Sequence, residues 1–325
     1  MSARTDSSRR PTPAELPIRE IRVSDEQAGP YAITAGPDDA LWLTLAHSGS
    51  IGRLALDETW TEFQLDPPTC APMIITTGPD EAMWYTRSGD HRIGRIGLDG
   101  QTETFPIPTA DAAPFGITTG PDDALWFTEL GSDRIGRISP EGQLSEFVLP
   151  VTGGVPSAIT AGPDGALWFT LNQANAIGRI ALDGTIAVYP IPTAASGPVG
   201  ITSDGEALWF VEIAAGQLGR LTSAGEFTEY ALPDRSAKPH AIVATGVGDC
   251  WFTEWAGNAV GHLIVSETIT ERGAVTEPEA VTEHRLPSAA SEPHGICRGP
   301  DGALWVALET GGVARLDGSR LDRRR

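Results

Sequence analysis

Residues 114–129 read Pro-Phe-Gly-Ile-Thr-Thr-Gly-Pro-Asp-Asp-Ala-Leu-Trp-Phe-Thr-Glu, and variants of this stretch recur along the whole chain. Its tryptophan returns every 41 or 42 residues until a last interval of 54, at Trp42, Trp84, Trp126, Trp168, Trp209, Trp251 and Trp305. A proline precedes each of these tryptophans by eleven or twelve residues, at Pro30, Pro72, Pro114, Pro156, Pro198, Pro239 and Pro293. The chain is therefore a sevenfold repeat.

Each repeat contains signals for four short strands. A Gly-Pro-Asp turn separates the proline segment from the tryptophan segment, and Gly, Pro and Asp suit a tight reversal. An Ile-Gly-Arg segment such as 135–137 follows, and Asp-Gly turns such as 99–100 then lead to a fourth segment. Four strands in a period of 40–45 residues indicate a blade of a β-propeller. We predict an all-β, seven-bladed β-propeller of four-stranded blades.

The seventh repeat lacks its fourth strand at the C-terminal end. Residues 18–23, Ile-Arg-Glu-Ile-Arg-Val, precede Pro30 as each fourth strand precedes the next proline. We expect this N-terminal strand to complete the last blade and close the ring, which removes unpaired sheet edges. The predicted organisation is a disordered tail at 1–14, the propeller at 15–318 and a basic tail at 319–325. The last interval between tryptophans is 54 residues instead of 42 and so contains 12 extra residues. We place them in 264–283, as a lengthened loop of blade 6.

Composition excludes several classes of partner. The chain has 43 Asp plus Glu against 23 Lys plus Arg, a net charge of −20, which argues against a nucleic-acid partner. Three widely spaced cysteines form neither a disulfide framework nor a CxxC zinc site, and they suit a reducing compartment. The N-terminus shows no apolar signal region, and no window reaches the ~20 apolar residues of a membrane span. We expect a cytoplasmic monomer with no membrane partner.

Function should lie where equivalent positions of the repeat diverge. The residue after the blade proline precedes the innermost strand and should line the mouth of the central channel. Around the ring it reads Tyr31, Met73, Phe115, Ser157, Val199, His240 and His294. A lone histidine here would more often bind a neighbouring carbonyl group. Two in adjacent blades of a chain with six histidines favour a functional role.

Blade 7 adds two carboxylates to the histidine pair. Glu292 is two residues before His294, and in an extended segment such residues point the same way. Glu309 lies one place later than the glutamates of blades 3 and 6, so its side chain should turn to the other face. Together, Glu292 and Glu309 could bind a hard cation, most simply Mg²⁺. The alternative is an ordinary Glu–His ion pair, which stabilises a protein surface little.

Other departures have simpler interpretations. Glu129, Glu212 and Glu254 recur without a neighbouring base or nucleophile, and we interpret them as structural. Trp255 could form the wall of a pocket for an apolar ligand or could serve packing. No phosphate-binding glycine loop and no Ser-His-Asp or Cys-His arrangement of recognisable spacing is present. A hydrolase with a covalent nucleophile is not supported.

Over residues 18–318 the chain resembles the virginiamycin B lyase family. The resemblance lies in Gly-Pro-Tyr-Ala-Ile-Thr at 29–34, Pro-Val-Gly-Ile-Thr at 198–202, Leu-Trp-Phe-Val-Glu at 208–212, Lys-Pro-His-Ala-Ile at 238–242, Trp-Phe-Thr-Glu-Trp at 251–255 and Glu-Pro-His-Gly-Ile at 292–296. That family is a seven-bladed propeller that linearises streptogramin B-type cyclic depsipeptide antibiotics by Mg²⁺-dependent elimination at an ester, which confers resistance.

The resemblance also implies roles for the residues singled out above. His294 matches the proton acceptor of the family, and His240 matches its substrate-contacting histidine, with Tyr31 placed beside it in the substrate-binding set. Glu292 and Glu309 match its Mg²⁺ ligands. The 12-residue insertion, the acidic excess, Met73 and Ser157 depart from the family pattern.

Two other functions remain open at this stage. A non-catalytic propeller could bind a peptide or glycan in its channel, because one fold supports many functions. A metal-dependent, lactonase-like hydrolase is the second. The histidine pair with its two glutamates favours a lyase over a binding module. The lactonase is disfavoured because the column after the proline holds no ring of Asp and Asn ligands.

Overall fold

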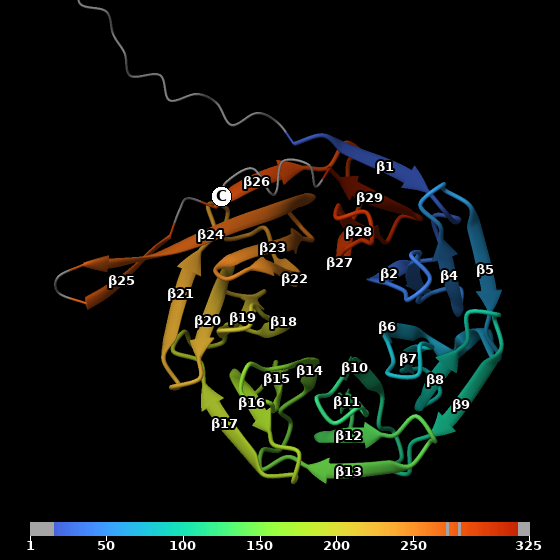
Figure 1. Cartoon of the computed structure of the whole chain (residues 1–325). Coiled ribbons are helices and arrows are strands. Elements are labelled where there is room, and N and C mark those ends of the chain that lie inside the picture. Colours follow the sequence, from blue (N-terminus) through green and yellow to red (C-terminus); the bar gives the residue numbers. More distant parts are fainter. Residues whose placement is uncertain (1–15, 271–272, 279–280, 318–325) are drawn as a thin grey trace, which may run out of the picture.

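The computed structural model describes residues 16–270, 273–278 and 281–317. Within these ranges the chain forms seven blades around a central channel, and each blade is an antiparallel sheet of four strands (Figure 1). The described residues include one 3₁₀ turn, η1 (Pro68–Cys70), and no α-helix. The predicted seven-bladed propeller is confirmed.

The strands follow the chain from the channel outwards in each blade. Blade 1 contains β2 (Pro30–Ala35), β3 (Leu41–Leu45), β4 (Ser50–Leu54) and β5 (Trp60–Gln64). Blade 2 contains β6 (Pro72–Thr77), β7 (Met83–Arg87), β8 (Arg92–Ile96) and β9 (Thr102–Pro106). Blade 3 contains β10 (Pro114–Thr119), β11 (Leu125–Glu129), β12 (Arg134–Ile138) and β13 (Leu144–Val148). Blade 4 contains β14 (Pro156–Ala161), β15 (Leu167–Leu171), β16 (Ala176–Ile180) and β17 (Ile186–Pro190).

The remaining three blades keep this order with two variations. Blade 5 contains β18 (Pro198–Ser203), β19 (Ala207–Glu212), β20 (Gln217–Thr222) and β21 (Phe227–Ala231). Blade 6 contains β22 (Pro239–Gly246), β23 (Asp249–Glu254), β24 (Ala259–Thr270) and β26 (Thr282–Arg285), with β25 (Gly273–Pro278) paired to the far part of β24. Blade 7 contains β27 (Pro293–Arg298), β28 (Leu304–Leu308), β29 (Gly312–Leu316) and β1 (Ile18–Arg22).

The ring is closed by the N-terminal strand, as predicted. β1 pairs antiparallel with β29 over its full length, from Ile18 opposite Leu316 to Arg22 opposite Gly312. In Figure 1 the first strand lies along the outer edge of the last blade. Ile18 packs against the apolar cluster between blades 6 and 7, and Ile21 against that between blades 7 and 1. The closing strand therefore adds both backbone pairing and apolar contact. The predicted tails at 1–14 and 319–325 fall outside the described residues.

The insertion in blade 6 is a hairpin and not the lengthened loop expected from the sequence. β24 continues past the blade and pairs with β25, from Val265 opposite Pro278 to Thr270 opposite Gly273. This hairpin projects away from the ring (Figure 1). The inserted residues are rich in Val, Ile and Thr, which favour strands.

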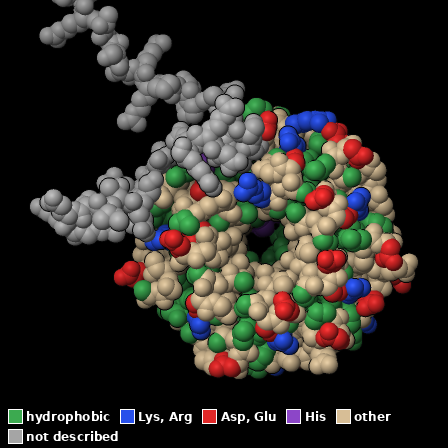
Figure 2. All heavy atoms as spheres, viewed as in Figure 1, with side chains coloured by type: hydrophobic (Ala, Val, Ile, Leu, Met, Phe, Trp, Pro, Cys, Tyr) green, Lys and Arg blue, Asp and Glu red, His purple; other side chains and the backbone are tan. Residues whose placement is uncertain are grey.

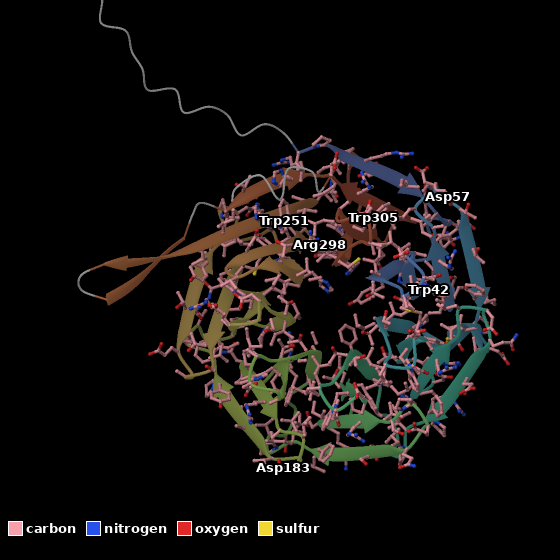
Figure 3. All side chains as sticks on the ribbon, viewed as in Figure 1. Trp42, Asp57, Asp183, Trp251, Arg298 and Trp305 are labelled. Carbon is pink, nitrogen blue, oxygen red and sulfur yellow. The ribbon has the colours of Figure 1, made fainter. Side chains whose placement is uncertain are left out.

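The recurring tryptophan and Ile-Gly-Arg segments have a common structural cause. In blade 3, Trp126 Nε1 donates to Asp122 Oδ1 at 2.9 Å, and Arg137 Nε donates to Asp122 Oδ2 at 2.7 Å. The same three-residue contact recurs in blades 1, 2, 4 and 7, through Asp38, Asp80, Asp164 and Asp301. Figure 3 shows Trp42, Trp251 and Trp305 inside their blades, whereas Asp57 and Asp183 lie at the perimeter. The turn aspartate thus ties the second strand of a blade to the third.

A buried threonine joins neighbouring blades. The Thr253 hydroxyl accepts the backbone N–H of Ala241 in its own blade at 3.0 Å and donates to the carbonyl of His294 in the next blade at 2.8 Å. In four more blades the equivalent threonine hydroxyl donates to the carbonyl of the residue that follows the next blade's proline. These pairs are Thr44–Met73, Thr86–Phe115, Thr128–Ser157 and Thr170–Val199. This bridge fixes the height of the residue after the proline in blades 2, 3, 4, 5 and 7.

The closing strand gives a test of the ring. Deleting residues 1–14 removes none of the described pairings, so we expect the melting temperature to stay within about 2 °C of the full chain. Deleting residues 1–24 removes β1 and its ladder bonds, each contributing about 0.5–1.5 kcal/mol, and exposes the apolar contacts of Ile18 and Ile21. A loss of several kcal/mol should lower the melting temperature by roughly 10 °C or more. Equal melting temperatures for the two truncations would contradict closure by β1.

Candidate active site

The innermost strands surround a cavity of about 420 Å³ on the channel axis. Each inner strand has a register irregularity between its proline and its isoleucine, as between Pro293 and Ile296 in blade 7. Behind this bulge every blade contributes one buried isoleucine to the wall, and these are Ile33, Ile75, Ile117, Ile159, Ile201, Ile242 and Ile296. Figure 2 shows the channel opening at the centre of the ring. The repeat therefore builds an apolar tube.

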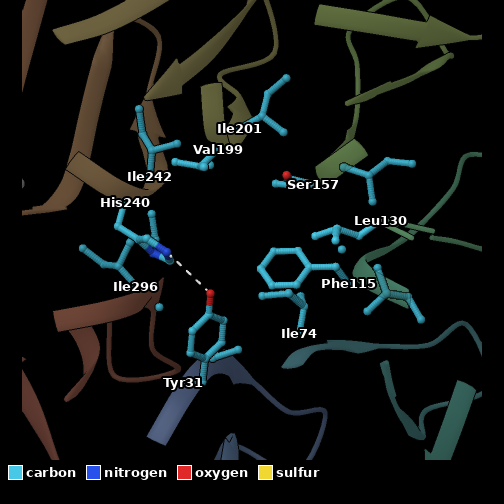
Figure 4. Close-up of a pocket in the computed structure, with 18 of the residues that line it drawn as sticks. Tyr31, Ile74, Phe115, Leu130, Ser157, Val199, Ile201, His240, Ile242 and Ile296 are labelled. Carbon is cyan, nitrogen blue, oxygen red and sulfur yellow. Dashed lines mark hydrogen bonds between the residues drawn. The ribbon is translucent and has the colours of Figure 1, made fainter. Parts of the chain in front are cut away.

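The two titratable side chains of the cavity wall lie together on one side of it. Phe115, Leu130 and Val199 line one part of the wall, whereas Tyr31 and His240 face each other across another part (Figure 4). The Tyr31 hydroxyl and His240 Nε2 are 3.5 Å apart. An apolar pocket with a few converging polar groups is typical of a small-molecule site.

His294 adjoins this polar side of the cavity. Its ring centroid is 4.5 Å from that of Tyr31 and 4.6 Å from that of His240. The structure thus brings together all three residues predicted as the catalytic and substrate-binding set. Only 7% of the surface of His294 is exposed, so its imidazole lies in a largely dry environment.

Glu309 contacts His294 directly. His294 Nε2 lies 2.6 Å from Glu309 Oε2, and His47 of blade 1 lies 3.1 Å from Glu309 Oε1. His47 was missed in the sequence because it lies outside the column after the proline. A signal existed: it stands five residues after Trp42, where the other blades have Gly, Gln, Ala or Thr.

Glu292 reaches the site by a route that the sequence argument did not foresee. Its φ is 51°, so it is left-handed, and the extended i to i+2 argument for its approach to His294 was wrong. The residue before the proline is left-handed in all seven blades, and blade 7 follows that rule. The Glu292 carbonyl accepts the N–H of Glu309 at 3.2 Å. Glu309 therefore stands between Glu292 and His294.

The electrostatics of the cluster keep both histidines neutral. Burial, followed by the charge of His47, lowers the pKa of His294 to about 4. Burial, followed by His294, lowers the pKa of His240 to about 3. Burial and the Glu309 carboxylate raise the pKa of Tyr31, which therefore keeps its proton. At neutral pH the cluster contains two imidazoles and one phenol, none of them charged.

The tautomer of His294 follows from its partner. A neutral imidazole whose Nε2 lies 2.6 Å from a carboxylate donates its N–H there, so Nδ1 carries the lone pair. Nδ1 is enclosed by protein and has no hydrogen-bond partner among the described residues. Nε2 is therefore the imidazole nitrogen at which a proton can be exchanged with a substrate.

The two glutamates fit a hard divalent cation. Partial burial and then the charge of Glu309 raise the pKa of Glu292, as expected for two carboxyl groups that share one small space. Within the ranges that the structure describes, no three His, Cys, Asp or Glu side chains are arranged as a complete ligand set. Mg²⁺ commonly uses one or two carboxylates and keeps several waters, and Glu292 and Glu309 are the carboxylates here that could hold it.

The remaining candidates lie outside the cavity wall. Glu129, Glu212 and Glu254 are fully buried, and none of them lines the cavity. Burial raises the pKa of each of these glutamates to about 7. Trp255 does not line the cavity either, and its ring packs against Lys238, whose Nζ lies 5.2 Å from the ring centroid. No described helix is long and apolar enough to cross a membrane.

Comparison with known proteins adds the family. The model of the virginiamycin B lyase family matches residues 16–316, which include both histidines and both glutamates of the cluster. The chain belongs to this family. A virginiamycin B lyase of Saccharopolyspora erythraea is 59% identical over 49 residues, which cover 15% of this chain and 16% of that protein. The matched segment thus spans about a sixth of that curated relative.

Two solved structures of the family match over nearly the full length. A streptogramin B lyase superposes with a TM-score of 0.85 at 39% identity and covers 93% of this chain and 97% of its own. A virginiamycin B lyase from Staphylococcus aureus superposes with a TM-score of 0.84 at 40% identity, covering 93% and 99%. The latter is a catalytically inactive variant with a histidine replaced by alanine, and it contains quinupristin.

Proposed function

We propose that this protein is a carbon–oxygen lyase that linearises streptogramin B-type cyclic depsipeptides by β-elimination at the threonyl ester, and that it thereby confers resistance. The observation that carries the proposal is the neutral His294 imidazole held against Glu309, with Tyr31 and His240 beside it at the cavity. Membership of the virginiamycin B lyase family supports it. Quinupristin in the Staphylococcus aureus relative supports the substrate class.

His294 is the proposed proton acceptor. Elimination requires a base that removes the proton on Cα, and a neutral imidazole can do this at neutral pH. We assign the proton to Nε2, because Nδ1 is enclosed by protein. In the structure Nε2 carries its hydrogen toward Glu309. Nε2 can accept the substrate proton only after Glu309 turns to another partner and the ring changes to the tautomer with its hydrogen on Nδ1. Glu309 therefore orients the imidazole ring and controls when Nε2 can accept the substrate proton.

The other two residues are proposed to position the substrate. His240 has its pKa lowered to about 3, so it carries no charge and cannot act as an imidazolium acid near neutrality. A strong acid is not needed, because the leaving group is a carboxylate whose acid has a pKa of about 3.5. Tyr31 keeps its phenolic proton and can donate a hydrogen bond together with the His240 ring. Both side chains face the cavity (Figure 4).

Glu292 and Glu309 are the proposed ligands of Mg²⁺. A divalent cation supplies positive charge for the carbonyl oxygen that becomes negative when Cα loses its proton. The two glutamates provide the hard oxygen donors that such an ion prefers. Because Glu309 contacts His294, an ion held by these two glutamates would lie beside the base.

One experiment separates the proposed lyase from the two competing functions. A binding propeller would leave the depsipeptide unchanged, and a lactonase-like hydrolase would add one water to it. Elimination opens the ring without a change in mass. Mass spectrometry combined with chromatography of the opened product therefore distinguishes the three.

The first prediction concerns the base. His294→Ala should lower kcat by about 10³-fold or more while the melting temperature stays close to that of the native chain, because the ring adjoins a cavity. His91→Ala is the matched control, since His91 is partly exposed on another blade, and it should keep native turnover. Product formation is followed by chromatography with mass detection. A near-native kcat in His294→Ala would show that His294 is not the base.

The second prediction concerns the metal and has a readout apart from turnover. Mg²⁺ should raise the melting temperature of the native chain, because an ion that binds only the folded state stabilises it. Glu292→Gln and Glu309→Gln should each abolish that rise, whereas Glu226→Gln on the exposed surface should keep it. EDTA should stop turnover, and added Mg²⁺ should restore it. Turnover that is insensitive to the chelator would exclude the metal role.

The third prediction concerns the threonine bridge that holds the backbone of His294. Thr253→Val preserves shape but leaves the Ala241 N–H and the His294 carbonyl without this partner, which should cost about 1–3 kcal/mol. Thr170→Val makes the equivalent change between blades 4 and 5. Both variants should melt earlier by a similar amount, and only Thr253→Val should lower kcat. Equal kcat values for the two variants would show that the bridge does not position the base.

A further inference from the structure

Pairs of residues form the rim of the propeller next to the candidate site. In every blade the fourth residue after the tryptophan donates its backbone N–H to the carbonyl of the residue before the proline, at 2.8–3.2 Å. These rim pairs are Ala46–Gly29, Ser88–Ala71, Leu130–Ala113, Asn172–Val155, Ile213–Gly197, Trp255–Lys238 and Glu309–Glu292. Blades 6 and 7 thus place Lys238 with Trp255, and Glu292 with Glu309, at equivalent positions.

In three of these pairs the first-named side chain contacts the following blade. Asn172 Nδ2 donates to the carbonyl of Pro198 in the next blade at 3.2 Å, and the Ser88 hydroxyl donates to that of Pro114. Glu309 likewise contacts His47 of blade 1. Because the backbone pairing is the same, we expect Trp255 of blade 6 to point toward Pro293 of blade 7. Lys238 also stands two residues before His240, whose ring centroid is 4.6 Å from that of His294, so the Trp255–Lys238 pair belongs to the part of the rim next to the catalytic cluster.

This pair offers a positive charge and an unused donor. The Lys238 ammonium lies 5.2 Å from the centroid of the Trp255 ring, a cation–π contact, and Lys238 is otherwise exposed. The Trp255 Nε1–H is buried and has no hydrogen-bond partner among the described residues. Lys238 is also the single lysine of a chain with net charge −20. The rim therefore changes from cationic in blade 6 to acidic in blade 7.

The proposed elimination creates an anion that needs such a partner. His294 takes the Cα proton, the C–H electron pair becomes the Cα–Cβ double bond, and the Cβ–O bond breaks with its electron pair on oxygen. The released group is a carboxylate, which remains part of the linear product. The Mg²⁺ proposed at Glu292 and Glu309 serves the carbonyl oxygen on the Cα side of the reaction, and neutral His240 cannot balance a new charge on the leaving-group side.

We propose that Lys238 and the Trp255 indole N–H form the subsite for the carboxylate released by ring opening. The ammonium balances the charge, and the indole N–H donates a hydrogen bond to a carboxylate oxygen. This inference rests on the proposed lyase function. It assigns to blade 6 the leaving-group side of the reaction and to blade 7 the proton-abstraction side.

The test measures binding without turnover, in the His294→Ala background. Three probes are compared by calorimetry: the cyclic depsipeptide, the linear dehydrobutyrine-containing peptide acid, and the same linear peptide as its C-terminal amide. Lys238→Gln should weaken binding of the acid by about tenfold or more and change the affinities for the amide and the cyclic ester by less than about twofold. Lys238→Arg should restore binding of the acid, because the charge is retained.

Trp255→Phe separates the indole donor from the ring. It keeps an aromatic face under the ammonium and removes the N–H, so binding of the acid should weaken by about threefold or more. If Lys238→Gln weakens binding of the acid and of the amide equally, or weakens binding of neither, the proposed carboxylate subsite is wrong while the lyase function stands. If none of the three probes binds the His294→Ala protein, the proposed function fails and the subsite fails with it.

Discussion

A buried threonine hydroxyl joins each of five blades to the next, and the geometry of the site depends on this contact. It accepts an N–H from the bulge of its own inner strand and donates to the carbonyl that follows the next blade proline. A buried polar group that is satisfied on both sides leaves little freedom of position. At these five junctions the residue after the next blade's proline, His294 among them, is therefore held at one height, whatever its side chain is.

Because of this regularity, a single substitution can introduce a reactive side chain without disturbing the fold. Two equivalent columns, the residue after each proline and the fourth residue after each tryptophan, meet at the channel mouth. In most blades they hold apolar or small polar side chains, whereas blades 6, 7 and 1 hold His240, His294, Glu309 and Tyr31. The reactive side of the cavity is the place where the repeat is least regular.

Burial gives these residues their chemical character. The low exposure of His294 keeps its imidazole neutral, and contact with Glu309 fixes its tautomer. Burial also raises the pKa of Glu129, Glu212 and Glu254 to about 7, although none of these glutamates lines the cavity. A shifted pKa therefore marks a functional residue only where geometry brings a partner and an accessible pocket together.

The sequence by itself determined the blade count, the strand order, the closing strand and the column that contains both histidines, because these depend on local turn chemistry and on a repeat with a fixed period. It did not predict the hairpin of blade 6, the left-handed backbone at Glu292 or the contribution of His47. Only the tertiary structure decided that Glu309 stands between Glu292 and His294, and that His47 of blade 1 meets blade 7. The physical reason is that ring closure brings the two ends of the chain together, and no local pattern encodes the distance between side chains on different blades.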